Sequence, residues 1–390
     1  MNKTLLGDIS SIITGPFGSQ LHMEDYVEDG IPVIMPQNIK NRTVDETWIA
    51  RITSDDFLRL NRYATMINDI IYARRGDVEK HAFVKDNSQM LCGTGCLRVR
   101  IMSEDIYPPY LSFYLNRPET KRWITSHAVG SNMPNLNTGI LEAVPIEYPD
   151  YKSQVRIAAV LQKLEEKIDI NNKINDYLEQ QMHLIYEHMM FNMLNNMICG
   201  KHIFAKDICN VVTGKEDANF ATENGKYKFF TCASTPSLCD EYVFESKSIL
   251  IAGNGEFNVK HYDGKFNAYQ RTYVLSPEPE LYGLLYLSSL YRINSFKSGS
   301  AGSIVKFITK GDVENIPVFI PNDTELIKSI NSLVHFQDQV SIENEQLCTL
   351  RDWLLPMLMN GQTTIEDSRL VHYQEVSGLL FLFHSPAHLH

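Results

Sequence analysis

Two long stretches of the chain contain neither glycine nor proline, the residues that most often interrupt a helix. These stretches run over 151–199 and 322–355. In the second, spacings of four and three alternate, close to the 3.5-residue period of a coiled coil, on Leu326, Ile330, Leu333, Gln337, Val340, Asn344, Leu347, Arg351 and Leu354. The pattern predicts two long helices of the coiled-coil type.

The rest of the chain consists of short strand-like runs separated by turn residues, so the predicted fold class is mixed α/β (α+β). Such runs are 31–34, 69–73, 97–101, 228–231, 248–251 and 272–275. The predicted segments are a first globular domain at 1–150, a central helical spacer at 151–200, a second globular domain at 201–320, a C-terminal helical spacer at 321–361 and a frayed or loosely docked tail at 362–390.

A single register relates the two halves of the chain. The segment 144–149 aligns with 316–321, which begins 172 residues later. The same offset joins residues that we expect to pair the two helices, namely Leu161 with Leu333, Ile168 with Val340, Asn172 with Asn344 and Leu178 with Leu350. The two halves are therefore predicted to be copies of one plan, related by a pseudo-twofold axis.

Upstream of the predicted helices the halves still correspond, with gaps where loops are expected. The segment 7–15 resembles 206–214, and 69–73 resembles 248–252. Each half is therefore predicted to be one α/β unit followed by one long helix.

Asn172 and Asn344 interrupt the apolar seams at equivalent positions of the repeat. A buried asparagine in a coiled-coil seam fixes register at a cost in stability. An exposed polar patch where the helices splay apart is the alternative interpretation. The repeated position favours the first.

Length and charge narrow the possibilities. A chain of 390 residues is long enough for two or three domains, and 44% hydrophobic residues exclude extended disorder. The formal net charge of −11 argues against a protein that coats nucleic acid without selection, but it leaves room for local basic faces.

Other features favour a soluble, cytoplasmic protein. No apolar run approaches the roughly 18 residues needed to cross a bilayer, and the first residues do not resemble a signal peptide. The seven cysteines are an odd, scattered set unlike a disulfide framework, so most are expected to be buried apolar residues.

Motifs that would indicate an enzyme are weak. Tyr107-Pro-Pro-Tyr110 is similar to the Asn-Pro-Pro-Tyr motif of amino-methyltransferases, but a tyrosine in first place cannot offer a side-chain carbonyl, and no Gly-rich loop accompanies it. The start of a helix at 111–115 is the favoured interpretation. Asp77 and Glu79 beside Lys80 do not follow the order of a metal-dependent nuclease.

Metal binding and nucleotide hydrolysis also lack support. Cys92 and Cys96 could form half of a zinc site, but no second pair at ligand spacing follows. There is neither a P-loop nor a G-x-S-x-G elbow. The sequence predicts no catalytic residue and no metal site.

Basic residues, in contrast, recur after equivalent strands ending at Ala73 and Ala252. Glycines and aromatic residues such as Phe83 and Phe257 lie among them, which suits loops that approach a phosphate backbone and stack or wedge against bases. The residues predicted to contact DNA are Lys40, Arg42, Arg74, Arg75, Lys80, His81, Lys85, Lys260, His261, Lys265, Arg271, Lys297 and Lys306.

Taken together, the duplicated plan resembles the DNA specificity subunit of type I restriction-modification systems. The resemblance covers about residues 5 to 358, and no single motif decides it. It rests on Thr14–Ser19, Tyr26, Gly30–Asn38, Gly130-Ser131, Val144–Ile146 and Gln154–Leu161 in the first half, and on Thr213-Gly214, Gly299-Ser300, Ile316–Val318 and the helix from Glu325 in the second.

This resemblance implies a non-catalytic subunit with two target-recognition domains separated by two antiparallel coiled-coil helices. Each domain would read one half of a bipartite double-stranded DNA target. The helices would dock methyltransferase subunits and, through the complex, restriction subunits. No cofactor is expected on this chain, because S-adenosylmethionine, Mg²⁺ and ATP would be bound by the partner subunits.

Two alternatives remain open at this stage. The chain could be a self-contained DNA methyltransferase or nuclease that uses Tyr107–Tyr110 or Asp77 and Glu79. It could also be a coiled-coil scaffold without a role on DNA.

Overall fold

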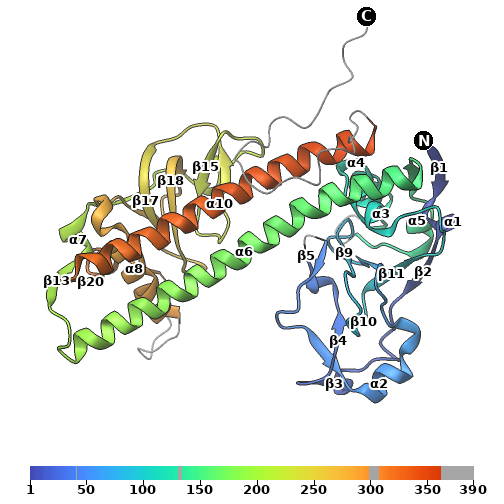
Figure 1. The fold of residues 1–390 in the computed structure, drawn as a ribbon, viewed down its shortest axis with the longest axis horizontal. Helices are drawn as coiled ribbons and strands as arrows, with labels where there is room; N and C mark the ends of the chain where they lie inside the picture. Colours follow the sequence, from blue (N-terminus) through green and yellow to red (C-terminus); the bar gives the residue numbers. More distant parts are fainter. Residues whose placement is uncertain (41, 131–133, 298–306, 362–390) are drawn as a thin grey trace, which may run out of the picture. The chain divides into compact units, whose positions relative to one another are not determined.

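The computed structural model describes residues 1–40, 42–130, 134–297 and 307–361. The chain divides into two compact units (Figure 1). Unit 1 is Met1–Lys167 with the chain from Leu347 onward, and unit 2 is Ile168–Gln346. The segment 362–390, predicted to be a tail, lies outside the described residues. Each unit combines β-sheets with helices, as the mixed α/β prediction requires.

Unit 1 contains a central antiparallel sheet in the order β2-β11-β8-β9 and a second sheet in the order β10-β4-β7-β3. Strands β1 and β12 pair separately, as do β5 and β6. The strands are β1 (Asn2–Leu5), β2 (Ser10–Thr14), β3 (Tyr26–Val27), β4 (Ile31–Ile34), β5 (Ile39–Lys40), β6 (Thr43–Val44), β7 (Ala50–Ile52), β8 (Ile70–Ala73), β9 (His81–Phe83), β10 (Leu91–Cys92), β11 (Cys96–Ile101) and β12 (Pro145–Tyr148).

Short helices connect and cover these strands. They are α1 (Leu6–Ile9), α2 (Ser54–Arg59), α3 (Pro108–Leu115), α4 (Pro118–His127) and α5 (Thr138–Glu142), with 3₁₀ turns η1 (Met23–Asp25), η2 (Pro36–Asn38) and η3 (Asn61–Tyr63). Tyr107-Pro-Pro-Tyr110 opens α3, where the missing N–H groups of Pro108 and Pro109 cost no helical hydrogen bond. The side chain of Tyr110 is fully buried. This motif is therefore the start of a helix, as expected.

Unit 2 is built around a six-stranded sheet in the order β14-β19-β17-β18-β15-β16, with β13 and β20 paired separately. Its strands are β13 (Gly200–Phe204), β14 (Val211–Thr213), β15 (Tyr227–Phe230), β16 (Ser237–Cys239), β17 (Phe244–Ala252), β18 (Val259–Ala268), β19 (Thr272–Leu275) and β20 (Pro317–Pro321). Its shorter helices are α7 (Ala205–Ile208), α8 (Tyr282–Lys297) and α9 (Lys310–Glu314), with η4 (Ala218–Phe220) and η5 (Pro279–Leu281).

The two units repeat one topology. The order β14-β19-β17-β18 in unit 2 reproduces β2-β11-β8-β9 in unit 1, and the pair β13-β20 reproduces β1-β12. Strands β8 and β17 contain the segments 69–73 and 248–252 that were aligned from the sequence. The internal repeat is thus confirmed.

Each half ends in a long helix, α6 (Tyr151–Leu194) and α10 (Thr324–Met359). The second extends past Pro356, where the sequence pattern placed its end. Proline at this position removes the hydrogen bond of its own N–H, and its ring crowds the carbonyl four residues earlier. Burial of Leu354, Leu355 and Leu358 then holds the last turn against unit 1.

Within unit 2 the two helices run antiparallel, because Asn171 contacts Glu343 whereas Asn175, one turn later, donates through Nδ2 to Ser341 Oγ at 3.1 Å, two residues earlier on α10. Asn171 Nδ2 donates to Glu343 Oε2 at 2.7 Å, and Asn344 Nδ2 donates to Asn172 Oδ1 at 2.8 Å. The partners in both contacts are 172 residues apart, so equivalent residues of the repeat meet. A local twofold axis of the helix pair passes between them.

These contacts correct the interpretation of Asn172. Its side chain is exposed, whereas the neighbouring Asn171 is fully buried. The buried asparagine of the pairing is therefore one position away from the predicted one. Among the other residues predicted to pair the helices, Leu161, Leu178 and Val340 are buried and Ile168, Leu333, Asn344 and Leu350 are partly buried.

An extensive apolar core lies in unit 2, where α6, α8 and α10 pack on the sheet. It includes Met182, Tyr186, Ile249, Leu285 and Val334. In unit 1, Cys92 and Cys96 lie in another apolar cluster, and burial raises the pKa of Cys92 to about 12. Cys239 is also buried, but Cys209, Cys232 and Cys348 are partly buried and Cys199 is exposed, so the expectation that most cysteines are buried is wrong. No helix in the described part of the chain is both long and apolar enough to cross a membrane.

Candidate nucleic-acid interface

Three loops of unit 1 meet at one end of its central sheet. Strand β11 is antiparallel to both neighbours, so its first residue, Cys96, pairs with Ala73 at the end of β8. The next residue, Leu97, pairs with Thr14 at the end of β2. The loops 15–22, 74–80 and 93–95 therefore leave the sheet at the same edge. We call these three loops the unit 1 loop cluster.

Close backbone contacts join the loops of this cluster. A Cβ on Gly15 would lie 2.1 Å from Gly93 O, so only glycine permits this approach. Thr94 Oγ1 donates to Pro16 O at 3.0 Å, and Arg74 N donates to Gly95 O at 2.8 Å. The cluster is one continuous surface.

An aromatic ring and two arginines lie on this surface. The guanidinium of Arg74 lies 5.5 Å from the ring centroid of Phe17, which is 54% exposed. Arg75 is exposed, and its backbone forms a bridge with Asn135. Asp77, the nearest acid in the sequence, pairs with Lys80. The same loop contains Glu79, whose charge opposes the lowering of the pKa of Lys121 by burial. Within the described residues neither Arg74 nor Arg75 forms an ion pair, so the loop, with three cations and two carboxylates, keeps a net positive charge.

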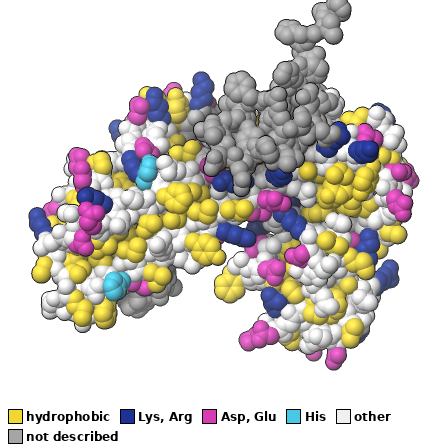
Figure 2. Space-filling model, viewed as in Figure 1, with side chains coloured by type: hydrophobic (Ala, Val, Ile, Leu, Met, Phe, Trp, Pro, Cys, Tyr) yellow, Lys and Arg dark blue, Asp and Glu magenta, His cyan; other side chains and the backbone are white. Residues whose placement is uncertain are grey.

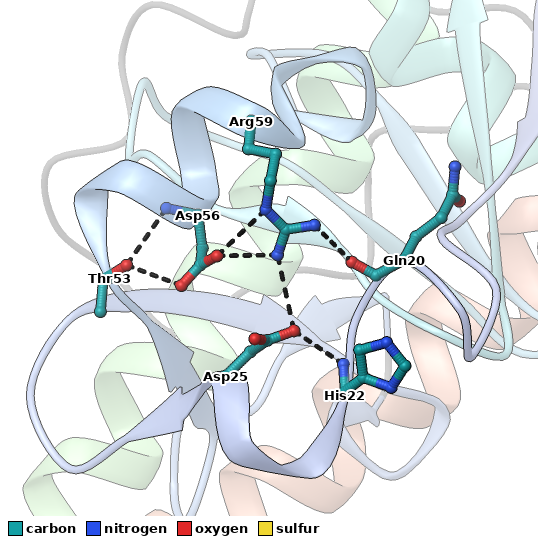
Figure 3. A network of polar contacts seen from close by, with 6 residues as sticks. All are labelled: Gln20, His22, Asp25, Thr53, Asp56 and Arg59. Atoms are coloured by element: carbon teal, nitrogen blue, oxygen red, sulfur yellow. Dashed lines mark hydrogen bonds and ion pairs between the residues drawn. The ribbon is translucent and has the colours of Figure 1, made fainter.

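A network centred on Arg59 supports the first of these loops (Figure 3). From α2, Arg59 Nη1 donates to Gln20 O at 2.7 Å and its Nη2 lies 3.5 Å from Asp25 Oδ2. Asp56 holds the guanidinium in place at 2.7 Å, and Thr53 caps the helix. Sequence patterns missed this network, because Gln20 and Arg59 lie 39 residues apart.

Two residues predicted to contact DNA are buried. Arg42 is 4% exposed; it forms an ion pair with Glu165 on α6 and its guanidinium lies 3.6 Å from the Phe113 ring centroid. His81 is 2% exposed, with Nε2 3.1 Å from Ser112 O. Both side chains join elements of unit 1, so neither is available to a ligand in this conformation.

The remaining predicted residues of unit 1 are on its surface. Lys40 pairs with Asp45 and Lys80 with Asp77, while Lys85 is exposed and has a partner within the chain. The aromatic Phe83, expected to lie among them as a stacking residue, is buried. Contact of Lys40, Arg74, Arg75, Lys80 and Lys85 with DNA stays a prediction.

In unit 2, loops at the equivalent end of the sheet are joined by equivalent backbone contacts. Gly253 N, after β17, donates to Arg271 O, before β19, at 2.8 Å. Asn254 forms a bridge with Phe307, as Arg75 does with Asn135, and Phe307 and Asn135 are 172 residues apart. Arg271 and Phe307 are exposed here. These loops form the unit 2 loop cluster.

Lys260 lies near this cluster, but it is partly buried. Its Nζ donates to Thr231 O at 3.1 Å, and burial lowers its pKa to about 8. Phe257, the second aromatic expected at the interface, is buried.

His261 and Lys265 lie away from this edge, along β18. His261 Nδ1 lies 2.7 Å from Asp338 Oδ1 on α10, and Lys265 pairs with Glu245. The dipeptides 80–81 and 260–261 are also not equivalent in register. Position 81 pairs with Tyr72, whereas His261 pairs with Ile249, two residues before the equivalent of Tyr72.

Two predicted residues cannot be placed as contacts. Lys297 ends α8, but its side chain lies outside what the structure describes, and Lys306 lies outside the described residues. The same holds for Ser131, Gly299 and Ser300 of the repeated Gly-Ser motifs. Contact of Lys260, His261, Lys265 and Arg271 with DNA stays a prediction.

The surface as a whole is mixed in charge. On the face seen in Figure 2, Lys and Arg side chains are scattered among Asp and Glu. Among the described residues, no group of three or more His, Cys, Asp or Glu is arranged to hold a metal ion. The unit 1 loop cluster therefore differs from the mixed surface of this acidic protein by its local positive charge.

Comparisons with known proteins agree with this construction. Residues 1–180 and 201–349 each match the type I restriction modification DNA specificity domain. The chain is 35% identical over 167 residues to the EcoDI specificity subunit of Escherichia coli, a match that spans 41% of this chain and 38% of that protein. It is 22% identical over 310 residues to the MjaIX specificity subunit of Methanocaldococcus jannaschii, spanning 68% of this chain and 72% of that protein.

A solved structure shares the fold. The type I restriction-modification S subunit from M. genitalium superposes with a TM-score of 0.57 over 92% of this chain and 95% of that chain, at 17% identity. With two specificity domains in sequence, two units of one topology and this structural match, the chain belongs to the DNA specificity family of type I restriction-modification systems.

Proposed function

We propose that this chain is the DNA specificity subunit of a type I restriction-modification complex, in which each unit reads one half of a bipartite target in double-stranded DNA. The observation that carries the proposal is that the same end of the central sheet presents loops in both units. Both units present loops from equivalent strand ends, yet the side chains differ, with Phe17 and Arg74 in unit 1 and Arg271 and Phe307 in unit 2. Different side chains on one scaffold suit two different half-sites.

The chain itself would carry no catalytic step. Methyl transfer, DNA cleavage and the binding of S-adenosylmethionine, Mg²⁺ and ATP would belong to the methyltransferase and restriction subunits, in the cytoplasm where the DNA lies. The burial of Tyr110 in α3 speaks against a methyltransferase site at that motif. Asp77 is exposed but pairs with Lys80, and among the described residues no group of three or more His, Cys, Asp or Glu is arranged to hold the metal ion of a nuclease.

A stripe of exposed apolar residues on α6 supports docking of a methyltransferase subunit. Ile170, Tyr177, Leu184 and Phe191 follow each other at intervals of seven and are 53%, 68%, 64% and 59% exposed. The opposite face of the helix carries the buried Leu178 and Met182. An exposed heptad stripe is the surface on which a further helix packs, so a helix of the partner subunit is the occupant we propose.

A domain exchange tests the division of the target. Residues 1–150 are replaced by the corresponding domain of another specificity subunit, and the assembled methyltransferase is mapped by sequencing of methylated bases. We expect one half of the modified sequence to change while the other half and the gap stay the same. A change in both halves would exclude separate reading by the two units.

Charge substitutions test the docking stripe. Tyr177→Lys with Leu184→Lys should abolish co-purification with the methyltransferase subunit, because two ammonium groups cannot be buried in a helix seam without partners. His183→Lys is the matched control, since it adds a charge on the flank of the same helix and can keep the contact with Glu187. Co-purification of the double variant at the wild-type level would refute docking on this stripe.

A further inference from the structure

Phe17 is an apolar side chain left at the surface by a loop that is otherwise well anchored. Its ring is 54% exposed and lies in a loop between Gly15 and Gly18. A Cβ added to the adjacent Gly18 would meet no atom within 4 Å outside its chain neighbours, so the space at this point of the loop is open. A flat group could therefore approach Phe17 without moving the chain.

Gln20 fixes the position of this ring through its backbone. Its side-chain Oε1 accepts from Phe17 N at 3.3 Å and from the hydroxyl of Tyr63 at 2.8 Å. Its carbonyl oxygen accepts from Arg59 at 2.7 Å, as Figure 3 shows. The loop that carries Phe17 is thus hydrogen-bonded to α2 and to η3, and the ring needs no reordering on binding.

The charges around Phe17 indicate which chemical class of ligand fits this surface. The loop 15–22 contains no carboxylate, and neither do 93–95 and 134–137. Arg74 lies over the ring, and Arg75, the next residue, is exposed. Of the two carboxylates in the loop 74–80, Asp77 pairs with Lys80 and Glu79 interacts electrostatically with Lys121. A ring next to a loop with a net positive charge fits a base with its phosphates, because every base has a flat face for stacking and every phosphate a negative charge.

We propose that Phe17 stacks on or wedges beside a base of the half-site read by unit 1, with Arg74 and Arg75 on the adjoining phosphates and with Gln20 and Arg59 as positioning residues. This inference rests on the proposed function, since it names a contact within the DNA site of that function. Stacking is sequence-tolerant, so Phe17 would contribute affinity and DNA distortion, while neighbouring polar groups read the base edges.

The test uses the complete methyltransferase complex and a duplex that carries its mapped target. 2-Aminopurine, whose fluorescence reports stacking, is placed in turn at each adenine position of both half-sites. Wild type should change the fluorescence at one position of the first half-site. Phe17→Ala should remove that change and weaken binding about tenfold, whereas Phe17→Trp should keep both.

Met23→Ala is the matched control, because Met23 is a 91% exposed apolar residue of the neighbouring turn η1. It should bind as wild type. Arg59→Gln should reproduce part of the loss seen in Phe17→Ala, and the double variant should be no weaker than Phe17→Ala alone, since Arg59 acts through the ring. Partial rescue by Arg59→Lys would support the positioning role.

Three results would overturn the proposal. The first is that the Phe17→Ala complex binds and distorts the duplex as the wild-type complex does. The second is that the Phe17→Ala chain no longer binds the methyltransferase subunit. The ring would then contact that protein and not a base. The third is a wild-type complex that binds no duplex in a sequence-dependent way, which refutes the proposed function itself, while the first two leave that function intact.

Discussion

At the scale of single residues, His81 makes the stability of unit 1 depend on pH. Burial holds its pKa well below the usual value of 6.5, and nearby Arg42 acts in the same direction. Ser112 O can only accept, so Nε2 carries the proton of the neutral ring, and Nδ1 has no partner among the described residues. A second proton would therefore enter an unsolvated position.

The sign of the pH effect follows from these two states. Above pH 6.5 the ring is neutral in both the folded and the unfolded chain. Below it, the unfolded chain binds a proton that the folded chain does not, so the free energy of unfolding falls by at most about 1.4 kcal/mol for each pH unit.

His81→Gln should remove this dependence, because glutamine can donate to Ser112 O and does not titrate. Urea unfolding at about pH 7 and about pH 5 measures it, with His22→Gln, at an exposed position, as the control. An unchanged pH dependence in His81→Gln would show that the buried ring takes up its proton without cost.

The ion pair of Arg42 with Glu165 is a second prediction at this scale. Its guanidinium is buried, donates to Ser112 Oγ at 3.1 Å and packs on Phe113. Glu165→Leu should lower the free energy of unfolding by about 3–5 kcal/mol, because it leaves a buried charge without its partner. Chemical denaturation measures the loss.

Two further variants separate charge from packing. Arg42→Met combined with Glu165→Leu should recover part of the loss, since no charge is then buried. Glu166→Leu, at the exposed neighbouring position, should change stability little. A double variant no more stable than Glu165→Leu would contradict the electrostatic explanation.

Burial explains why these two residues were mistaken for DNA contacts. Arg42 and His81 lie in polar, loop-like sequence, and only contacts with Ser112 and Glu165, up to 123 residues away, place them in the interior. A pattern of neighbouring residues does not contain such contacts. The position of Arg74 and Arg75 in a surface loop could be predicted, because a strand end followed by basic residues and glycine is a local feature, while their contact with DNA stays a prediction.

At the scale of elements, the contacts between α6 and α10 distinguish two neighbouring asparagines that the sequence alone did not separate. Asn171 is fully buried and its amide donates to Glu343, whereas Asn172 is exposed. Asn171→Ala should lower the free energy of unfolding by about 1–3 kcal/mol, since it leaves a carboxylate without this donor. Asn172→Ala should cost less than about 0.5 kcal/mol. Urea unfolding followed by far-ultraviolet circular dichroism compares them, and equal losses would contradict the assignment.

The elements themselves were largely predictable. Both long helices lack glycine and proline, and the aligned strands β8 and β17 occupy equivalent places in their sheets. Helix ends were less predictable, as Pro356 within α10 shows, because burial of Leu354 and Leu358 outweighs a local breaker. The exact buried asparagine was also missed, since one residue turns a helix by 100°.

At the scale of the whole molecule, net charge is a poor guide to the site. The chain carries −11, yet the unit 1 loop cluster is positive, because its loop 74–80 has three cations against Asp77 and Glu79 and the loops 15–22 and 93–95 contain no carboxylate. The segment 321–361, by contrast, has six acidic and two basic residues. Under the proposed function, we therefore expect the isolated chain to bind DNA with modest affinity and the methyltransferase subunits to supply further phosphate contacts.

The repeat also leads to a prediction about the association of the isolated first half of the chain. On α10, Leu354 and Leu358 are buried against unit 1, and the equivalent positions on α6, Met182 and Tyr186, are buried in unit 2. Asn172 and Asn344, which are equivalent, meet directly. The helix α6 of a second copy could therefore take the place of α10.

A chain cut after residue 199 should accordingly form a symmetric dimer, because a lone α6 would expose Leu161, Leu178 and Met182 to water. Sedimentation equilibrium should give twice the mass of the fragment. Leu161→Lys with Leu178→Lys should return it to a monomer, while Lys173→Glu, at an exposed position of the same helix, should leave the dimer intact. A monomeric, folded wild-type fragment would mean that α6 needs the distinct sequence of α10, and that the symmetry of the helix pair is one of backbone alone.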